Sequence, residues 1–361
     1  MKVRQFRGLR LRPGNDMSPP ALPHPNGWFG VGLATEWKAG TILTKPFMDG
    51  EIVVYRTKKG VIRAVEPYCP HLGAHLGSGR IDGENIICPF HKFGFGPDGN
   101  CTVTPYGTPP RATLATLHVR EQYGIIWVWH AHDRTPPTWE LPALPSGEVL
   151  AQRAIDLVGH PQEVAENTVD YGHIATLHKM STEEESAPTA DGPLYSVHAR
   201  LRVKTFGFGN FSKTSAFQLI GPGAVYVRAY LPWNIYVDNW TLATPIGPWR
   251  IRLWLAMGTG RTRDGKRRPA PSRRSKALSR MLGRCAVAAF WPIVTEDFPI
   301  MHHKRYVPHP RLNDKDGPVG HFRHWASQFY PPPPADEKPP PAATRVPDKA
   351  DHVDARSEDR R

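Results

Sequence analysis

The first 140 residues of the chain alternate between apolar and polar positions over short distances. Residues 41–66 alternate around Asp-Gly and Lys-Gly turn signals, and another apolar stretch, 123–130, follows turns rich in glycine and proline. A period of two, interrupted by such dipeptides, is typical of antiparallel strands joined by hairpins. We therefore predict that residues 1–140 are all-β.

The pattern changes after residue 150. A helical segment is predicted around 161–180, and a second one, with an apolar stripe, from about 272 to 289. Between them lie strand-like stretches at 198–211, 224–233 and 249–258. This order of elements predicts an α+β fold in which a β-domain is followed by a domain of one large sheet and a few helices.

Two proline-rich segments divide the chain. We predict that residues 133–148 are a linker between the two domains. Residues 331–361 contain almost no large apolar side chain, and we predict that they are disordered. The 361 residues are enough for two or three domains with cores of their own.

Composition favours a globular protein of a reducing compartment. Hydrophobic residues make up 40% of the chain, and no unbroken apolar run reaches the roughly 18 residues of a membrane span. The basic N-terminus lacks the apolar stretch of a signal peptide behind it. The four cysteines do not suggest a disulfide framework. We therefore expect a cytoplasmic protein without a membrane span.

The net charge of +13 is concentrated in two segments. Residues 1–12 carry +5 and residues 261–284 carry +9, whereas 331–361 carry −1 and the remaining body is neutral. No nucleic-acid-binding signature accompanies these patches, so they suit an acidic protein partner at least as well as a nucleic acid, or they are solvated basic loops.

Two cysteines and two histidines form a compact motif in residues 68–91. Cys69-x-His71 and Cys88-x-x-His91 are separated by sixteen residues. Two Cys and two His are also a common zinc set, but zinc fingers pair Cys with Cys and His with His. The alternating order, the spacing and the proline after each cysteine resemble the Rieske motif. In a Rieske [2Fe–2S] cluster, two imidazoles replace two thiolates on one iron and raise the potential.

The Rieske resemblance assigns the ligands to two irons. It places Cys69 and Cys88 on one iron and His71 and His91 on the other. His75 lies in the same loop, but no ligand position remains for it, and we interpret it as a surface residue.

A second histidine pair follows at 166–180. Glu166, Asp170, His173 and Leu177 have the spacing of one helical face, and His178 would meet His173 on one metal if the helix widens or ends there. Two histidines on a helix are more often core or surface residues. However, the pattern Asn-x-x-Asp-x-x-His-x-x-x-x-His, which starts at Asn167, resembles the mononuclear iron site of Rieske non-haem oxygenases.

Such a site needs one carboxylate to complete a 2-His-1-carboxylate face with open positions for O₂. Glu296 and Asp297 stand in an apolar setting and resemble the family's Gln/Glu-Asp pair, which favours Asp297 as the ligand and keeps Glu296 in reserve. The alternative is that both are N-terminal charges of a helix turn. We interpret His302 and His303 as surface or structural residues.

Residues 25–330 as a whole resemble the α-subunits of Rieske oxygenases. Within them, four stretches are most similar to bacterial 3-ketosteroid 9α-hydroxylase oxygenase components and Neverland-type cholesterol 7-desaturases: 26–40, 68–79, 166–178 and 316–330.

This resemblance implies a basic extension (1–24), a Rieske domain (25–145), a helix-grip catalytic domain (150–330) and a disordered tail (331–361).

The resemblance also implies how chains and centres cooperate. Three chains would associate head to tail, so that the cluster of one chain lies beside the mononuclear iron of its neighbour. Asp170 matches the family's bridging aspartate, which hydrogen-bonds a Rieske histidine across the interface and an iron-ligating histidine of its own chain. Two departures affect the docking surface and the pocket: Lys92-Phe93 replaces Gly-Trp, and residues 298–303 are Phe-Pro-Ile-Met-His-His.

The implied activity is that of a terminal oxygenase. Electrons from NAD(P)H would pass through a separate reductase and a ferredoxin, because this chain has no nucleotide-binding glycine fingerprint. The reaction would hydroxylate or desaturate a steroid or sterol-like polycycle. Two alternatives stay open: O-demethylation or tailoring of an aromatic or natural product, and a Rieske electron carrier or redox sensor without oxygenase activity.

Overall fold

The N-terminal part of the chain folds into small antiparallel sheets, as its alternating pattern predicts. The computed structural model describes residues 22–332, except 206–208, 232–234, 264–265 and 268–272. The basic extension and the proline-rich tail predicted from the sequence therefore lie almost entirely outside the described residues.

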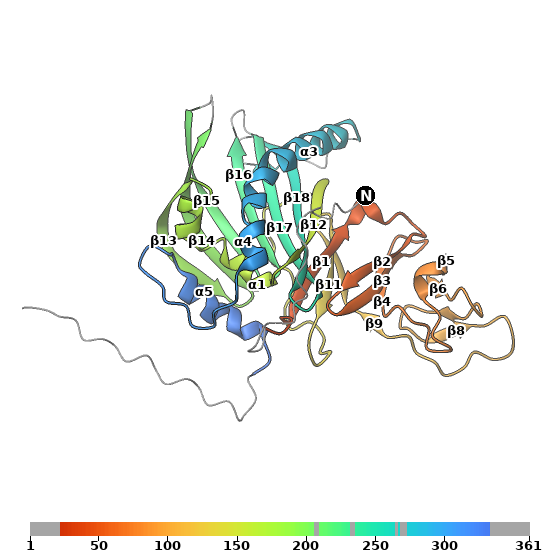
Figure 1. Cartoon of the computed structure of the whole chain (residues 1–361). Coiled ribbons are helices and arrows are strands. Elements are labelled where there is room, and N and C mark those ends of the chain that lie inside the picture. The colour runs from red at the N-terminus through yellow and green to blue at the C-terminus, as the bar shows by residue number, and fades with distance from the viewer. Residues whose placement is uncertain (1–21, 206–208, 232–234, 264–265, 268–272, 333–361) are drawn as a thin grey trace, which may run out of the picture. The chain divides into compact units, whose positions relative to one another are not determined.

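Three sheets make up this part (Figure 1). The first contains β1 (Gly27–Leu33), β11 (Ile125–His130) and β10 (Val119–Gln122). The second contains β2 (Ile42–Phe47), β3 (Gly50–Arg56), β4 (Ile62–Val65) and β9 (Thr116–Leu117). The third contains β5 (Arg80–Asp82), β6 (Asn85–Ile87), β7 (Gly94–Phe95) and β8 (Cys101–Val103). Short 3₁₀ turns follow β1 (Ala34–Glu36) and precede β5 (Leu76–Ser78).

One large antiparallel sheet dominates the second part. Its order is β12 (Ala151–Val158), β18 (Arg250–Arg263), β17 (Ile235–Gly247), β16 (Ala224–Leu231), β15 (Gly209–Ile220), β14 (Leu194–Thr205) and β13 (Ser181–Asp191). The short strand β19 (Lys266–Arg267) pairs with the end of β18. The strand-like stretches predicted between 198 and 258 all belong to this sheet, which confirms the α+β fold.

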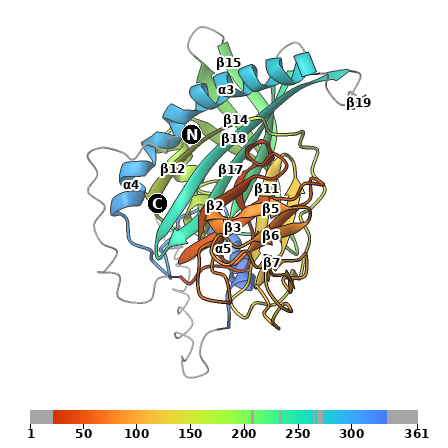
Figure 2. The same ribbon diagram turned by 90° about the vertical axis from the view of Figure 1, so that its right-hand side faces the viewer.

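Helices cover one face of the large sheet (Figures 1 and 2). They are α1 (Pro161–Glu166), α2 (Tyr171–Thr176), α3 (Arg273–Glu296), α4 (Phe298–His303) and α5 (Val319–Ala326), with a 3₁₀ turn at Ser327–Phe329. Val287 and Trp291 of α3 are buried against β12 and β18. Phe322 and Trp325 of α5 pack on buried side chains of β14 and β15.

The segment predicted as one helix around 161–180 is two short helices. Asp170 leaves helical geometry, and its Oδ1 accepts a hydrogen bond of 3.0 Å from the backbone N–H of His173, so that it caps α2. The prediction that Glu166, Asp170, His173 and Leu177 share one continuous helical face is therefore wrong. Helix α2 stops at Thr176, so that the condition under which His178 could meet His173 on one metal is fulfilled.

Helix α3 continues beyond the predicted end at residue 289. It includes Pro292 and runs to Glu296, where Pro299 prevents a further helical hydrogen bond to the carbonyl of Thr295. Asp297 thus lies at the junction of α3 and α4.

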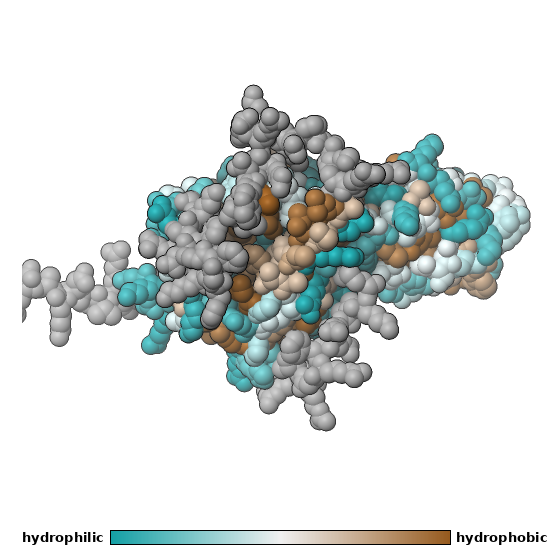
Figure 3. Space-filling view, turned by 90° about the horizontal axis from the view of Figure 1, so that it is seen from above, coloured by the Kyte–Doolittle hydropathy of each residue, from teal (hydrophilic) through white to brown (hydrophobic). Residues whose placement is uncertain are grey.

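The outer face of α3 is also apolar. Leu278 and Met281 are 53% and 55% exposed, and Figure 3, which looks onto this side of the molecule, shows apolar side chains gathered in the middle of the face. By length and composition alone, residues Ala277–His303 could cross a membrane. The prediction concerned unbroken apolar runs, and this segment is not one, because Arg280 and Arg284 interrupt it. Core helices of folded domains meet the same criterion, and the inner face of α3 packs on the sheet.

The two parts of the chain share a core. Trp28 and Trp127 of the first sheet pack with Trp240 and Trp254 of the large sheet, and the described residues up to Tyr330 form one compact unit. The segment predicted as a linker, 133–148, contains no helix or strand, but it is packed rather than free. Its Trp139 carbonyl accepts a hydrogen bond of 2.9 Å from Nε1 of Trp28.

Candidate metal centres

Two loops beside the β5–β8 sheet bring the four residues of the Cys-His motif together. Cys69 and Cys88 are buried among apolar side chains. A backbone hydrogen bond of 2.9 Å from the N–H of Gly73 to the carbonyl of Cys69 closes the first loop, and one of 2.8 Å from Cys88 to Phe93 closes the second. The rings of His71 and His91 lie 4.8 Å apart, at the tips of the loops.

The donor set fits a [2Fe–2S] cluster. Burial raises the pKa of Cys69 to about 11, with a further contribution from the adjacent Cys88 thiol. A bound metal would reverse this shift by stabilising the thiolate. Nδ1 of His71 is buried and has no hydrogen-bond partner among the described residues, although buried polar atoms are nearly always satisfied. A metal bond to this nitrogen would satisfy it. Phe93 stacks on the His71 ring at 4.4 Å and holds it in place.

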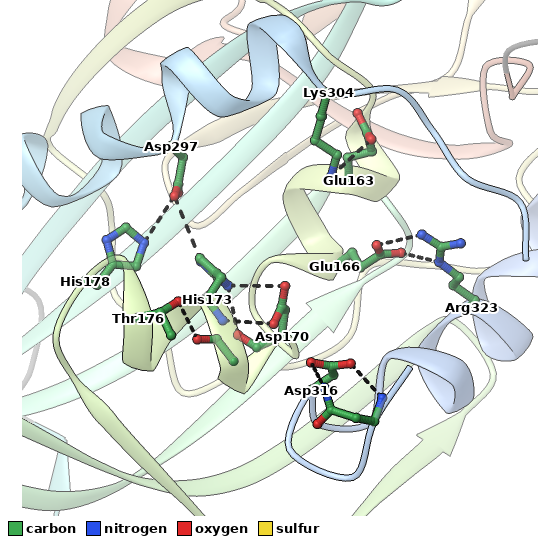
Figure 4. Close-up of polar contacts among 12 residues, drawn as sticks. Glu163, Glu166, Asp170, His173, Thr176, His178, Asp297, Lys304, Asp316 and Arg323 are labelled. Carbon is green, nitrogen blue, oxygen red and sulfur yellow. Dashed lines mark hydrogen bonds and ion pairs between the residues drawn. The ribbon is translucent and has the colours of Figure 1, made fainter. Parts of the chain in front are cut away.

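A second donor set lies between α2 and the α3–α4 junction (Figure 4). His173 belongs to α2, and His178 follows the end of that helix. Asp297 reaches them from the opposite side: its Oδ1 lies 3.2 Å from Nε2 of His178 and 3.9 Å from Nε2 of His173. One ligand atom from each residue lies within 4.8 Å of the others, which is close enough to hold one metal ion.

The charges at this site favour a cation. The carboxylate of Asp297 and then that of Glu296 raise the pKa of His178, against the effect of burial. The position between the imidazoles and Asp297 is therefore electrostatically suited to a positive charge, which a divalent metal would supply. Two imidazoles and one carboxylate, with the remaining side open, are the donor set of non-haem Fe(II) oxygenases.

A cavity of about 290 Å³ opens onto the three candidate ligands. Its lining consists of Asn167, Asp170, His173, Thr176, Leu177, Asp297, Ile300, Met301 and Lys304. Leu177, Ile300 and Met301 make an apolar wall, while Asn167 and Lys304 supply polar groups. A concave site with an apolar wall and few polar groups is typical of a small-molecule pocket.

Comparison with known families decides the identity of both centres. Residues 27–118 match the Rieske [2Fe-2S] domain, and residues 128–330 match the 3-ketosteroid 9α-hydroxylase C-terminal domain. The chain belongs to the 3-ketosteroid 9α-hydroxylase family of Rieske oxygenases. It is therefore an oxidoreductase with a [2Fe–2S] cluster and a catalytic non-haem iron, and it needs O₂ and a redox partner.

Curated relatives match nearly the whole oxygenase chain. A cholesterol 7-desaturase of Bombyx mori is 28% identical over 344 residues, which cover 88% of this chain and 72% of the relative. A probable 3-ketosteroid-9-alpha-monooxygenase oxygenase component of Rhodococcus rhodochrous is 26% identical, with 87% of this chain and 82% of the relative covered.

Solved structures share the fold of this Rieske oxygenase. Dicamba monooxygenase bound to dicamba has a TM-score of 0.58 at 16% identity, covering 86% of this chain and 98% of that one. A Pseudomonas putida CBB5 NdmA mutant with theobromine has a TM-score of 0.61 at 17% identity, covering 83% and 89%.

The structure brings most of the predicted site residues of the oxygenase together. His173, His178 and Asp297 converge, and Asn167 and Asp170 line the same cavity. Asp170 also touches His173 directly: its backbone carbonyl accepts a hydrogen bond of 2.8 Å from Nδ1 of that residue. Glu296, the reserve ligand, lies instead on the other side of His178, where its Oε2 is 3.0 Å from Nδ1.

The histidines set aside as non-ligands have structural contacts. His75 accepts a hydrogen bond of 3.0 Å from the N–H of Gly77 and lies 3.0 Å from Glu51. Nδ1 of His303 contacts the carbonyl of Pro299 at 2.8 Å. Lys92, which stands where relatives were expected to have glycine, has a φ of 60°, a conformation that glycine adopts without strain.

A buried ionic network beside the pocket was not predicted from the sequence. Arg323 of α5 makes a bidentate pair with Glu166 of α1 at 2.6 and 2.8 Å. Lys304, just after α4, pairs with buried Glu163 at 3.2 Å. These pairs tie α4 and α5 to α1 and so fix one wall of the cavity. The signal in the sequence was two acidic residues on one short helix, but their basic partners lie more than 140 positions away.

Proposed function

We propose that this chain is a terminal oxygenase that hydroxylates or desaturates a C–H bond of a steroid or sterol-like polycycle. The observation that carries the proposal is the convergence of His173, His178 and Asp297 on a cavity with an apolar wall. The curated relatives support the substrate class, since their names refer to cholesterol and to 3-ketosteroids.

Most residues at the pocket have a physical role in this reaction. His173, His178 and Asp297 hold the iron, which supplies O₂ activation when it is bound. Leu177, Ile300 and Met301 exclude water and contact the apolar rings of the substrate. Asn167 and the ammonium of Lys304 can hydrogen-bond a hydroxyl or keto oxygen of the substrate and so orient the reacting carbon.

We further propose that electrons cross between chains of a head-to-tail homotrimer. Figure 1 supports this, because β5, β6 and β8 lie away from α1 and α4 in the same chain. Around His71 and His91, the side chains of Tyr68, Leu72 and Phe90 are 57%, 65% and 60% exposed. Exposed apolar groups of this kind mark an interaction surface, and the half-exposed Asp170 carboxylate would meet it from the neighbouring chain.

The proposed redox partners are a ferredoxin and an NAD(P)H-dependent reductase in the cytoplasm. The basic segment 261–284 would attract an acidic carrier by long-range electrostatics. We also propose the domain boundaries predicted above, with the Rieske domain at 25–145 and the catalytic domain at 150–330.

Reconstitution tests the proposed reaction. The oxygenase is combined with a surrogate ferredoxin, its reductase and NADH, and O₂ uptake and product mass are measured for a panel of 3-ketosteroids, sterols and aromatic ethers. We expect a steroid product about sixteen mass units heavier, or a sterol product about two lighter. Coupled O₂ uptake only with aromatic ethers would replace the steroid proposal by O-demethylation, and absence of coupled turnover would favour an electron carrier.

A further inference from the structure

We propose that Glu296 is a positioning residue for the mononuclear iron. Its carboxylate accepts the hydrogen bond of Nδ1 of His178 and thereby directs Nε2 of that imidazole toward the metal. The inference rests on the proposed function, because it assigns a role relative to the iron that His173, His178 and Asp297 hold. Glu296 is then not an alternative iron ligand, but a residue that orients the ligand His178.

The His178 ring lies between two consecutive carboxylates. Oε2 of Glu296 is 3.0 Å from Nδ1, and Oδ1 of Asp297 is 3.2 Å from Nε2. An ionised carboxylate only accepts hydrogen bonds, so the contact with Glu296 places the proton of a neutral imidazole on Nδ1. The lone pair is then on Nε2, the nitrogen that faces Asp297 and His173.

The junction of α3 and α4 explains why neighbouring acids reach opposite sides of one ring. Successive residues of a helix point about 100° apart. Glu296 is the last residue of α3, and Asp297 precedes α4. Glu296 is half exposed, whereas the side chain of Asp297 is 16% exposed and faces the cavity. The geometry therefore favours Asp297 as the metal ligand and Glu296 as the hydrogen-bond acceptor of the His178 ring.

His178 needs this support more than His173 does. Nδ1 of His173 donates to the backbone carbonyl of Asp170, which the capped start of α2 holds in place. His178 lies after the end of α2 and before β13 begins at Ser181, and the next residue, Lys179, has a left-handed φ of 57°. Among the described residues, the ring nitrogens of His178 contact two side chains: Nε2 contacts Asp297, and Nδ1 contacts Glu296.

Carboxylates that accept from the distal nitrogen of a metal-bound histidine fix its orientation and raise its basicity, and their loss typically lowers metal affinity about 10–100-fold. Replacement of Glu296 should therefore act on the mononuclear iron and leave the Rieske cluster unchanged.

The test compares Glu296→Ala, Glu296→Gln and a matched control, Asp314→Ala, which removes an exposed carboxylate between α4 and α5. Holoproteins are mixed with a ferrous chelator, and release of the mononuclear iron is followed while the visible absorption of the Rieske cluster serves as internal reference. We expect Glu296→Ala to release this iron about 10–100-fold faster than wild type. Glu296→Gln, whose amide oxygen still accepts from Nδ1, should stay near wild type, as should Asp314→Ala.

Each other outcome has a definite meaning. If Glu296→Ala releases iron at the wild-type rate, the positioning role is overturned. If Glu296→Gln loses iron as fast as Glu296→Ala, the carboxylate acts as a ligand or through its charge, which also overturns the hydrogen-bond role. A wild-type protein that contains two irons per chain instead of three would overturn the proposed function itself, before any variant is compared. Unchanged thermal unfolding of the variants excludes a general loss of structure.

Discussion

At the scale of single residues, different local contacts hold the three proposed ligands of the mononuclear iron. The backbone carbonyl of Asp170 fixes His173 from within its own helix. Glu296 contacts His178, which lies outside regular structure. Asp297 lies at the α3–α4 junction, where the buried rings of Trp291 and Phe298 pack against each other. We therefore expect the site to depend on side chains and backbone groups that are not themselves ligands.

Asp170 caps α2, and we propose that its carboxylate also couples the two centres; a substitution can distinguish these roles. Its carboxylate caps α2, a contact that Asn also makes well, whereas alanine at an N-cap costs about 1 kcal/mol. We expect Asp170→Asn to keep the fold and both metal centres, because the cap remains, but to lower turnover at least about tenfold, because the carboxylate charge between the centres is lost.

The measurement is steady-state turnover with the iron content and the Rieske spectrum recorded on the same sample. Wild-type turnover in Asp170→Asn would show that the carboxylate does not couple the centres.

At the scale of elements, α1 is stabilised by a buried histidine that titrates far from its usual range. His160 caps the helix: its Nδ1 accepts from the N–H of Gln162 at 3.2 Å, and its Nε2 donates to the carbonyl of Pro23 at 3.1 Å. Burial lowers the pKa of His160 to about 3. The unfolded chain therefore binds one more proton than the folded chain between pH 3 and 6.5, and stability is lost as the pH falls through this range.

Replacement of His160 by asparagine should flatten this dependence. The asparagine side chain would keep an N-cap acceptor but would not titrate. Between pH 4.5 and 6, the free energy of unfolding of His160→Asn should fall less steeply than that of wild type, by about 1.4 kcal/mol per pH unit. Denaturant unfolding at several pH values measures both slopes. Parallel slopes would contradict a neutral, buried His160.

The pair between α1 and α5 should contribute to stability through its burial. The side chains of Arg323 and Glu166 are 16% and 11% exposed, and removal of one partner leaves the other charge without its counter-ion. We expect Glu166→Ala to lower the free energy of unfolding by about 3 kcal/mol. Glu140→Ala removes the same kind of bidentate pair, with Arg120, at an exposed site and should cost at most about 1 kcal/mol.

Urea unfolding of both variants gives this comparison directly. Equal losses in Glu166→Ala and Glu140→Ala would mean that the buried pair does not anchor α5 to α1.

At the scale of the whole molecule, the two centres of one reaction belong to distant parts of one chain. The proposed cyclic, head-to-tail trimer would pair the cluster of each chain with the iron of the next. Mixed trimers test this arrangement. The variant His71→Ala lacks a cluster ligand, and His173→Ala lacks an iron ligand, so that each homotrimer should be inactive.

A trimer that contains both variants has one interface at which an intact cluster faces an intact iron. Differently tagged chains are coexpressed and purified on both tags, and their turnover should return to about one third of the wild-type value per trimer. A doubly tagged His71→Ala trimer is the control. Mixed trimers that stay inactive would mean that electrons pass within one chain.

The sequence predicted local features better than long-range ones. The residues of the Rieske motif are close to one another in the chain, and so are His173 and His178. The alternation of residues 41–66 located three strands. The break at Asp170 was missed, because the helical spacing of Glu166, His173 and Leu177 persists across a residue whose side chain caps a new helix. The pairing of Glu166 with Arg323 could not be predicted, because the two residues are 157 positions apart and only tertiary packing brings them together.

Side-chain directions at the end of α3 also depend on tertiary packing, which the sequence pattern does not show. The sequence favoured Asp297 over Glu296 only through a family resemblance, because the residue pattern does not show how the two side chains are directed. That depends on how the α3–α4 junction turns each side chain relative to His178, and the junction is set by Pro299 and by the packing of Phe298 and Trp291.

A Rieske oxygenase of this kind holds a [2Fe–2S] cluster and a separate mononuclear iron in one chain. Iron and acid-labile sulfide per chain, measured on the protein purified without oxygen, test it most directly. We expect three irons and two sulfides in wild type, and two of each in His173→Ala with an unchanged Rieske spectrum. Two irons per chain in wild type, or no difference in iron content between wild type and His173→Ala, would contradict it.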